Sequence, residues 1–125
     1  MHMTIFEIKR VQGGARGRSS GSAAGGFAWA VATSDDDVAD MYQQTRNALA
    51  KIDGILAGLG TDKTHLVNAT VYIDAFQLKG EMDRAWCEWI GDDPANWPQR
   101  ACIEARLHSY GLVEIVVIAA APAPG

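Results

Sequence analysis

The sequence predicts a single α+β domain in which two amphipathic helices lie on one face of a β-sheet. Two observations support this fold class: apolar residues recur at helical spacing in two segments, and elsewhere they alternate or cluster in short runs bounded by glycine, aspartate or proline. The 125 residues contain no internal repeat and no linker, so residues 1–125 are expected to form one domain. Two helices can cover only one face of such a sheet. We therefore expect the other face to be wet or covered by a second copy of the chain.

The N-terminal part is predicted to contain two strands separated by a loop. Thr4 to Val11 alternates loosely and is predicted to be the first strand. Gly13 to Gly26 is dominated by glycine, serine and alanine, which is typical of a flexible loop, with a short strand near Ser22 to Ala24. Phe27 to Thr33 is an apolar run of strand length and is predicted to be the next strand.

A long helix is predicted to follow. Asp35, Asp36 and Asp37 supply N-cap chemistry and favourable negative charge at a helix start, and Gly60 is predicted to cap its end. The residues that recur at helical spacing between these points form one apolar stripe: Val38, Met41, Thr45, Ala48, Leu49, Ile52, Ile55, Leu56 and Leu59.

The C-terminal half is predicted to contain three strands and a second helix. His65 to Ile73 alternates cleanly, as a half-buried strand does. A shorter helix follows, and its inner stripe is marked by Met82, Ala85, Trp86 and Trp89. The last two strands are predicted over Arg100 to Leu107 and Leu112 to Ala120. Because only the short link His108 to Gly111 joins them, we expect these two strands to be neighbours in the sheet.

Composition and charge disfavour several classes of function. The formal net charge of −4 disfavours nucleic acid as a partner. No apolar run is long enough to span a membrane and no signal-peptide pattern is present, so we expect a cytoplasmic protein with no membrane partner. The three histidines lack metal-ligand spacing, and Cys87 and Cys102 form no CxxC pair, so no metal is expected.

Arg100 is the first candidate for a functional side chain. Alternation along its strand is predicted to turn one set of residues toward the helices: Ala101, Ile103, Ala105 and Leu107. Arg100, Cys102, Glu104 and Arg106 are then predicted to lie on the opposite face, which we expect a partner subunit to cover. A guanidinium there offers a rigid fork that suits a carboxylate. The alternative, which the residues alone slightly favour, is that Arg100 and Arg106 pair with Glu104 or Glu114.

Glu114 is the second candidate, because it interrupts an apolar strand. A carboxylate among apolar residues must find a polar partner or become harder to ionise, and both conditions are common at catalytic sites. The alternatives are a buried ion pair with Arg100 or an oligomer contact. Cys102 is a third candidate as a nucleophile. No histidine has an evident claim to be its base, so a packed thiol is the favoured interpretation.

The C-terminal segment also carries a longer pattern. It reads PQRACIEARL from Pro98 to Leu107 and continues with LVEI from Leu112 and IA from Ile118. This resembles the signature of the Rid/YjgF family of reactive-intermediate (enamine/imine) deaminases, roughly P-x-R-x-C-V-E-x-A-R-L, a short loop, then V-E-I-x-x-I-A. Three further stretches fit the family, so the resemblance covers nearly the whole chain: Gln44 to Asp53, Val67 to Ile73 and Met82 to Trp86.

The resemblance implies a chorismate-mutase-like α+β fold, assembled as a homotrimer with active sites in the clefts between subunits. It also implies that small enamines or imines are hydrolysed to a 2-oxo acid and ammonia, without a metal or organic cofactor. Arg100 matches the arginine that binds the substrate carboxylate, and Glu114 matches the glutamate that positions or activates the attacking water. Cys102 matches a cysteine that lines the site.

Three positions depart from the family pattern within the implied site. Ser19 falls near the family's tyrosine, Val31 near a serine, and Asp83 at the asparagine of the second helix, while Arg18 is a further candidate beside Ser19. These departures leave two alternatives open: a related hydrolase of another small carbonyl-nitrogen compound, and a non-catalytic trimer that binds a small ligand. Some relatives are labelled endoribonucleases, but the acidic net charge disfavours RNA cleavage.

Overall fold

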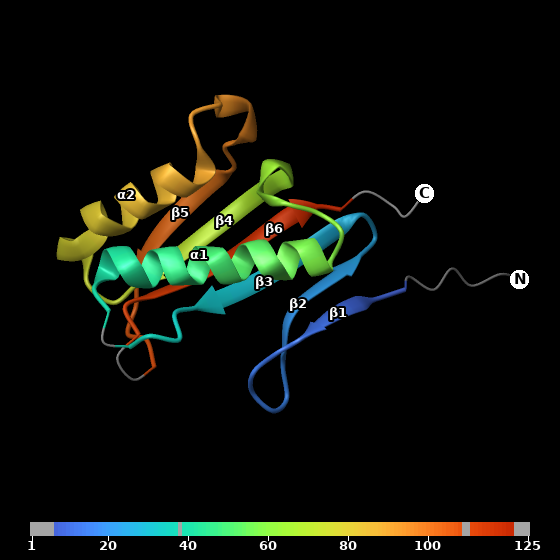
Figure 1. Cartoon of the computed structure of the whole chain (residues 1–125), viewed down its shortest axis with the longest axis horizontal. Coiled ribbons are helices and arrows are strands. Elements are labelled where there is room, and N and C mark those ends of the chain that lie inside the picture. The colour runs from blue at the N-terminus through green and yellow to red at the C-terminus, as the bar shows by residue number, and fades with distance from the viewer. Residues whose placement is uncertain (1–6, 38, 109–110, 122–125) are drawn as a thin grey trace, which may run out of the picture.

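A mixed sheet with two helices on one face forms the protein, seen here in a computed structural model that describes residues 7–37, 39–108 and 111–121 (Figure 1). The strands are β1 (Lys9–Gln12), β2 (Ser19–Ala24), β3 (Phe27–Thr33), β4 (Leu66–Ile73), β5 (Gln99–Glu104) and β6 (Val113–Ala120). The helices are α1 (Met41–Gly58) and α2 (Lys79–Ile90), with short 3₁₀ turns η1 (Lys63–His65), η2 (Phe76–Leu78) and η3 (Pro94–Asn96). The predicted α+β class is confirmed.

The strands lie in the order β1-β2-β3-β6-β4-β5 across the sheet. β4 and β5 run parallel because α2 carries the chain back between them, and β6 lies antiparallel to both of its neighbours, β3 and β4. The prediction that the last two strands are neighbours is therefore wrong. β5 ends at Glu104 rather than Leu107, so the connection to β6 is longer than the predicted link and can step past β4. Residues 109–110 of that link lie outside the described ranges.

The glycine-rich segment corrects a second prediction. β2 occupies much of the stretch predicted as a loop, and it is hydrogen-bonded to β1 on one side and β3 on the other. Gly21 explains why this composition suits a strand here: a Cβ at that position would lie 2.4 Å from Cγ2 of Ile55 on α1. β1 covers only the end of the predicted first strand, and residues 4–6 of that prediction lie outside the described ranges.

Helix α1 begins later than predicted. Asp40 is its N-cap and accepts a 2.8 Å hydrogen bond from the backbone N–H of Gln43. Asp35, one of the three aspartates predicted to cap the helix, instead pairs with Lys51 at 3.0 Å. The sequence offers several aspartates in succession with similar capping chemistry, so the cap cannot be chosen from residue type alone. Val38 lies outside the described residues.

The far end of α1 is closed by a Schellman motif. The C-cap is Leu59, and Gly60, predicted as the cap, lies one residue beyond it with φ of +82°. The N–H of Thr61 donates to the carbonyl of Leu56 at 3.0 Å, and the N–H of Gly60 to that of Ala57 at 3.1 Å. Glycine suits this position because its φ is left-handed.

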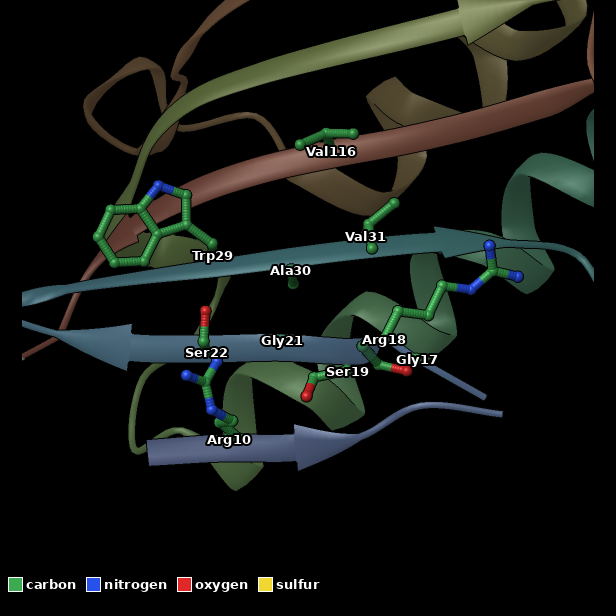
Figure 2. A pocket seen from close by; sticks show the side chains of 11 residues that line it. Arg10, Gly17, Arg18, Ser19, Gly21, Ser22, Trp29, Ala30, Val31 and Val116 are labelled. Atoms are coloured by element: carbon green, nitrogen blue, oxygen red, sulfur yellow. The ribbon is translucent and has the colours of Figure 1, made fainter. Parts of the chain in front are cut away.

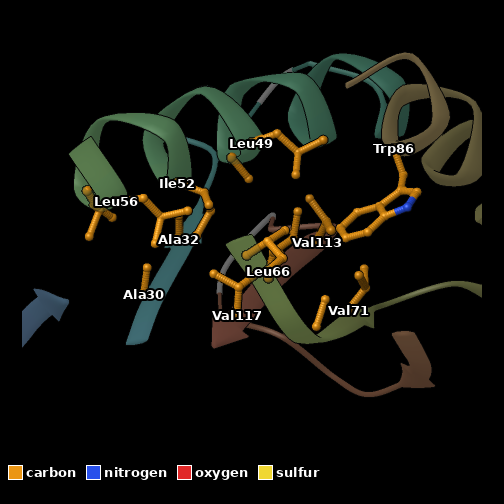
Figure 3. Close-up of a cluster of buried hydrophobic side chains, with 14 of the residues drawn as sticks. Ala30, Ala32, Leu49, Ile52, Leu56, Leu66, Val71, Trp86, Val113 and Val117 are labelled. Atoms are coloured by element: carbon orange, nitrogen blue, oxygen red, sulfur yellow. The ribbon is translucent and has the colours of Figure 1, made fainter. Parts of the chain in front are cut away.

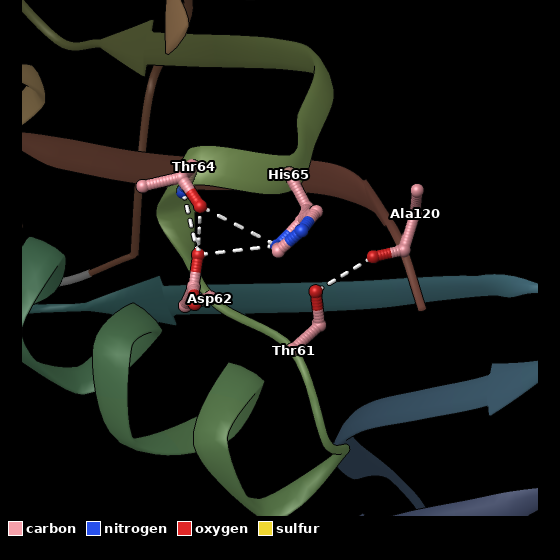
Figure 4. Close-up of polar contacts among 5 residues, drawn as sticks. All are labelled: Thr61, Asp62, Thr64, His65 and Ala120. Carbon is pink, nitrogen blue, oxygen red and sulfur yellow. Dashed lines mark hydrogen bonds and ion pairs between the residues drawn. The ribbon is translucent and has the colours of Figure 1, made fainter. Parts of the chain in front are cut away.

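A fixed connection then leads into β4 (Figure 4). Thr61 Oγ1 donates to the carbonyl of Ala120 on β6 at 2.6 Å, which ties the turn to the end of the sheet. Asp62 caps η1 by accepting from the N–H of Thr64 at 2.8 Å, and Nδ1 of His65 lies 3.2 Å from the same carboxylate oxygen. Hydrogen bonds from the hydroxyl and backbone of Thr64 lower the pKa of Asp62. His65 therefore belongs to a capping cluster, and β4 begins after it.

The core lies between α1 and the inner face of the sheet, the face that the helices cover (Figure 3). The predicted stripe of α1 is confirmed by its buried members: Met41, Thr45, Ala48, Leu49, Ile52, Ile55, Leu56 and Leu59. Alternate residues of the central strands pack against it: Ala69, Val71, Ile73, Val113, Ile115, Val117 and Ala119. Burying one such aliphatic side chain contributes about 1.5–3 kcal/mol, so this layer holds the helices on one face.

The outer face, the face of the sheet away from the helices, is also apolar. Its exposed large side chains are Phe27, Trp29, Val31, Val67 and Ile103. Nothing in the described part of the chain covers them. A contiguous apolar surface of this kind is typical of a protein interface or a ligand groove. Neither described helix has the length and apolar character that crossing a membrane requires.

Candidate functional site

Arg100 lies on the edge strand β5, on the inner face and beneath α2. Its Nη2 donates to Oδ1 of Asp83 at 2.6 Å, and its Nη1 lies 3.7 Å from Sδ of Met82. The guanidinium carbon is 5.3 Å from the ring centroid of Trp86. The side chain is 19% exposed, so the charge is held in a partly dry setting against one acid and one aromatic ring.

The predicted facing of β5 is therefore wrong. Ala101 and Ile103, predicted to pack on the helices, are exposed on the outer face, while Cys102 packs against the edge of the core. The outer face of this sheet is itself apolar, so apolar alternation does not distinguish the two faces of β5. A long arginine stem can cover apolar surface as readily as an aliphatic residue can.

Asp83 bridges two cations at the opening of this cluster. While Oδ1 accepts from Arg100, Oδ2 accepts from Nζ of Lys79 at 2.7 Å. Burial alone would raise the pKa of Asp83, but the hydrogen bonds from Lys79 and Arg100 outweigh it and lower the pKa below its usual value. Asp83 is therefore charged at neutral pH, and a ligand carboxylate that approaches Arg100 meets an anion already in place.

Cys102 lies on the same face as Arg100. Burial raises the pKa of its thiol, although the positive charges of Arg100 and Lys79 partly offset this effect. The thiol form is thus favoured at neutral pH, and the thiolate is the nucleophilic form. This supports the packed-thiol interpretation over the nucleophile.

Glu114 lies on the opposite side of the sheet from Arg100. It is half-buried on the outer face of β6, opposite Thr33 on β3 and Tyr72 on β4. Within one chain the alternative of an ion pair with Arg100 is wrong, since β4 separates their strands and the two side chains use different faces. The alternative that Arg100 or Arg106 pairs with Glu104 is wrong as well. Arg100 pairs with Asp83, Arg106 has no ion pair among the described residues, and Glu104 accepts from the N–H of Phe76 at 2.9 Å. Among the described residues, none donates a hydrogen bond to the carboxylate of Glu114.

A hollow of about 620 Å³ opens on the outer face (Figure 2). We call it the outer hollow. It is lined by Arg10, Gly17, Arg18, Ser19, Ser20, Gly21, Ser22, Trp29, Ala30, Val31 and Val116. Its volume falls within the range of small-molecule sites. Glu114 does not line the hollow, but it precedes the lining residue Val116 by two positions on the same face of β6.

The predicted site residues thus divide into two groups. Arg100, Asp83 and Cys102 meet beside α2, at the free edge of the sheet. Ser19 and Val31 line the outer hollow, and Glu114 lies on the same outer face of the sheet. One chain does not bring the two groups together.

Sequence reasoning missed several residues of both groups. Lys79 beside Asp83 had a readable signal, because residues four apart lie on the same side of a helix. Arg10 and Trp29 had none, because both depend on β2 being a strand: Arg10 lies opposite Ser22, which lies opposite Trp29. Within residues 7–37, 39–108 and 111–121, no cluster of three acidic, histidine or cysteine side chains is arranged to hold a metal.

Comparison with known proteins gives consistent matches. The model of the endoribonuclease L-PSP family matches residues 22–121. A RutC family protein from Haemophilus ducreyi is 47% identical over 75% of this chain and 78% of its own length. The RutC family protein YoaB of Escherichia coli is 34% identical over 66% of this chain and 71% of its own length. A solved YjgF family member from Neisseria meningitidis superposes with a TM-score of 0.85 at 29% identity, covering 94% of this chain and 98% of that one.

Proposed function

Because this chain belongs to the endoribonuclease L-PSP family, which includes the YjgF and RutC proteins, we propose that it is an enamine/imine deaminase. In this proposal it hydrolyses a small 2-enamino or 2-imino acid to the 2-oxo acid and ammonia. The site lies between subunits, and the reaction needs no metal or organic cofactor.

The observation that carries the proposal is the setting of Glu114. This carboxylate is half-buried on an apolar strand, two residues before Val116, which lines the hollow. It has no hydrogen-bond partner among the described residues, so it is free to hold a water molecule. A structural carboxylate in such a strand would instead be satisfied by its own chain. An oriented carboxylate beside a substrate pocket can act as a general base.

Arg100 complements Glu114 as the anchor for the substrate carboxylate. A guanidinium carries five N–H donors, and the contacts with Asp83 and Met82 use only Nη2 and Nη1. Donors therefore remain for a second carboxylate. The rigid, partly dry setting over Trp86 keeps the fork in one orientation, which reduces the entropy lost on binding.

The chemistry asks little of the protein beyond positioning. Protonation of the enamine at its β-carbon gives an iminium ion, whose C=N carbon is electrophilic. Glu114 accepts a proton from water as the water oxygen bonds to that carbon, which gives a neutral carbinolamine. Glu114 then returns the proton to the amino group, the C–N bond breaks with loss of ammonia, and the hydroxyl gives up its proton to leave the 2-oxo acid. General base catalysis of this kind is worth about 10²–10⁴-fold.

Assembly is part of the proposal. Within one chain Arg100 and Glu114 lie on opposite faces of the sheet, so a site that uses both needs a second subunit. In the proposed homotrimer, the β5 edge of one subunit meets the outer face of the next. Such a contact joins two different surfaces, and contacts of this kind close into rings. The apolar side chains of the outer face supply the area to bury.

Asp83 favours a second candidate within the same chemistry. The asparagine that the family resemblance implies would leave Arg100 with its full charge, whereas Asp83 cancels part of it. We propose as the alternative that the site hydrolyses another small carbonyl-nitrogen compound. Such a substrate would carry less negative charge at Arg100, or carry its anionic group away from Arg100.

The direct test generates 2-aminoacrylate in situ and follows its loss with and without the protein. We expect acceleration over buffer, and loss of about 100-fold in kcat/KM or more for Arg100→Ala and for Glu114→Gln. Arg106→Ala is the matched control, because this exposed arginine follows the same strand and lies outside both groups. No acceleration over buffer would contradict the deaminase. Equal rates for wild type and Arg100→Ala would contradict the role of Arg100.

A further inference from the structure

Resting on the proposed function, we propose that Arg10 and Arg18 make the outer hollow a subsite for a second carboxylate, so that the preferred substrate is an enamino or imino acid with an acidic side chain. The substrate would be a dianion, with one carboxylate on Arg100 and the other in the hollow.

The charge of the outer hollow is the first argument. Its lining includes two arginines and no acidic residue, although the chain as a whole carries a net charge of −4. Neither arginine has a hydrogen bond or ion pair with a residue in the described ranges. Arg100, by contrast, is paired with Asp83. A concave surface that gathers one sign of charge concentrates ligands of the opposite sign.

The placement of the two arginines is the second argument. Arg10 on β1 lies opposite Ser22 on β2, and Ser22 lies opposite Trp29 on β3, so the three form a row across the outer face. Arg18 lies near Val31, toward the other end of the hollow (Figure 2). An extended ligand on the apolar floor can therefore reach a guanidinium toward either end.

The turn that carries Arg18 depends on two glycines. A Cβ at Gly13 would lie 2.5 Å from the carbonyl oxygen of Arg18, so the two backbone segments are in close contact. Gly17, just before Arg18, has φ of +91°, which favours glycine. The position of Arg18 therefore depends on glycine at residues 13 and 17.

The chemistry of the lining selects the ligand class. A guanidinium prefers a planar carboxylate that it can contact with two parallel N–H donors. Hydroxyls of Ser19 and Ser22 add further donors, and the apolar floor of Trp29, Val31 and Val116 suits the carbon chain between the charges. The arginines lie toward opposite ends rather than side by side (Figure 2), so either one can contact the second carboxylate, whereas one phosphate held by both does not fit.

Binding of two product analogues tests this inference directly. We expect 2-oxoglutarate, a dianion, to bind at least about tenfold more tightly than 2-oxovalerate, the monoanion of equal chain length, by calorimetry. The double variant Arg10→Ala, Arg18→Ala is expected to bring this ratio close to one. Arg16→Ala is the matched control: it removes an exposed arginine of the same loop that does not line the hollow, and should keep the ratio.

Further arms separate this inference from the proposed function. Arg10→Lys with Arg18→Lys keeps the charges and should retain part of the ratio, which covers the case in which the alanine double variant fails to fold. Equal affinity for the two acids would overturn the subsite even if 2-aminoacrylate is hydrolysed. If the affinity ratio of the two acids depends on Arg10 and Arg18 but the protein hydrolyses no imine, the subsite stands and the proposed deaminase activity is contradicted.

Two other outcomes would also overturn the subsite. Inorganic phosphate that binds in place of 2-oxoglutarate, with the same dependence on Arg10 and Arg18, would show that the hollow is a phosphate site. A loss of oligomer stability in the alanine double variant, with the ratio unchanged, would show that the arginines hold a neighbouring subunit.

Discussion

Asp83 is the single residue that most directly affects how strongly Arg100 can bind a ligand carboxylate. Its two carboxylate oxygens form ion pairs with Lys79 at 2.7 Å and Arg100 at 2.6 Å. Asp83 therefore partly neutralises the positive charge that a substrate carboxylate would bind. At 34% exposure the side chain is only partly screened by water. A ligand must therefore share Arg100 with an anion that belongs to the protein.

We predict that Asp83→Asn strengthens binding of a simple 2-oxo acid by about three- to tenfold, because asparagine can still accept from Arg100 but carries no charge. Calorimetry with 2-oxobutyrate measures this change. Glu81→Gln, on the same helix and without a contact to Arg100, is the control. Unchanged or weaker binding by Asp83→Asn would show that the aspartate does not compete.

The pH dependence of this effect follows from the lowered pKa of Asp83. A carboxyl group whose pKa is lower in the folded state stabilises the fold at any pH above its pKa in the unfolded state, which is about 3.9. That contribution is lost as the pH falls through the pKa of the folded state. The affinity gain of Asp83→Asn should therefore be constant between about pH 5 and pH 8, since Asp83 stays ionised throughout.

Cys102 illustrates how burial sets reactivity at one atom. Because burial raises the pKa of its thiol, we predict that it reacts with iodoacetamide at least about tenfold more slowly than the exposed Cys87 at neutral pH. Mass spectrometry of partially labelled protein gives the two rates within one sample. Preferential labelling of Cys102 would contradict this and return it to the list of nucleophiles.

At the scale of elements, periodic patterns of apolar residues predict which face of a helix or strand is buried. The stripe of α1 and the strand Phe27 to Thr33 follow from burial of one face, and the structure confirms them. The alternation of β4 is confirmed from Ala69 to Ile73, but a register shift between Leu66 and Asn68 leaves Val67 exposed and Leu66 buried. Sheet order does not follow from periodicity, and neither does the face that β5 turns inward. The position of β6 between β3 and β4 depends on long-range pairing, which a local pattern does not contain.

The contact between β2 and α1 makes an element-scale prediction. A Cβ at Gly21 would lie 2.4 Å from Cγ2 of Ile55 and 2.8 Å from the carbonyl oxygen of Trp29. Gly21→Ala should therefore push α1 from the sheet and cost about 1–3 kcal/mol of the free energy of unfolding, measured in urea. Gly14→Ala is the matched control, with nothing within 4 Å, and should stay within about 0.5 kcal/mol.

At the scale of the whole molecule, the sequence predicted an uncovered sheet face but not what the two faces carry. The family resemblance named Arg100 and Glu114 as partners in one site, and periodicity placed them side by side on neighbouring strands. The structure places Arg100 on the inner face and Glu114 on the outer face, with β4 between their strands. A residue pattern names the members of a site, but their placement depends on tertiary and subunit geometry.

Mixed oligomers give this geometry a decisive test. If Arg100 of one subunit acts with Glu114 of the next, then inactive Arg100→Ala and inactive Glu114→Gln proteins should regain activity when unfolded together and reassembled. In randomly mixed rings, about one quarter of the sites receive an intact arginine from one subunit and an intact glutamate from its neighbour, so about one quarter of wild-type activity is expected. If both residues acted within one chain, every chain would carry one defect and no activity would return. Reassembly of each variant alone is the control, and it must stay inactive for the recovered activity to report on sites formed between subunits.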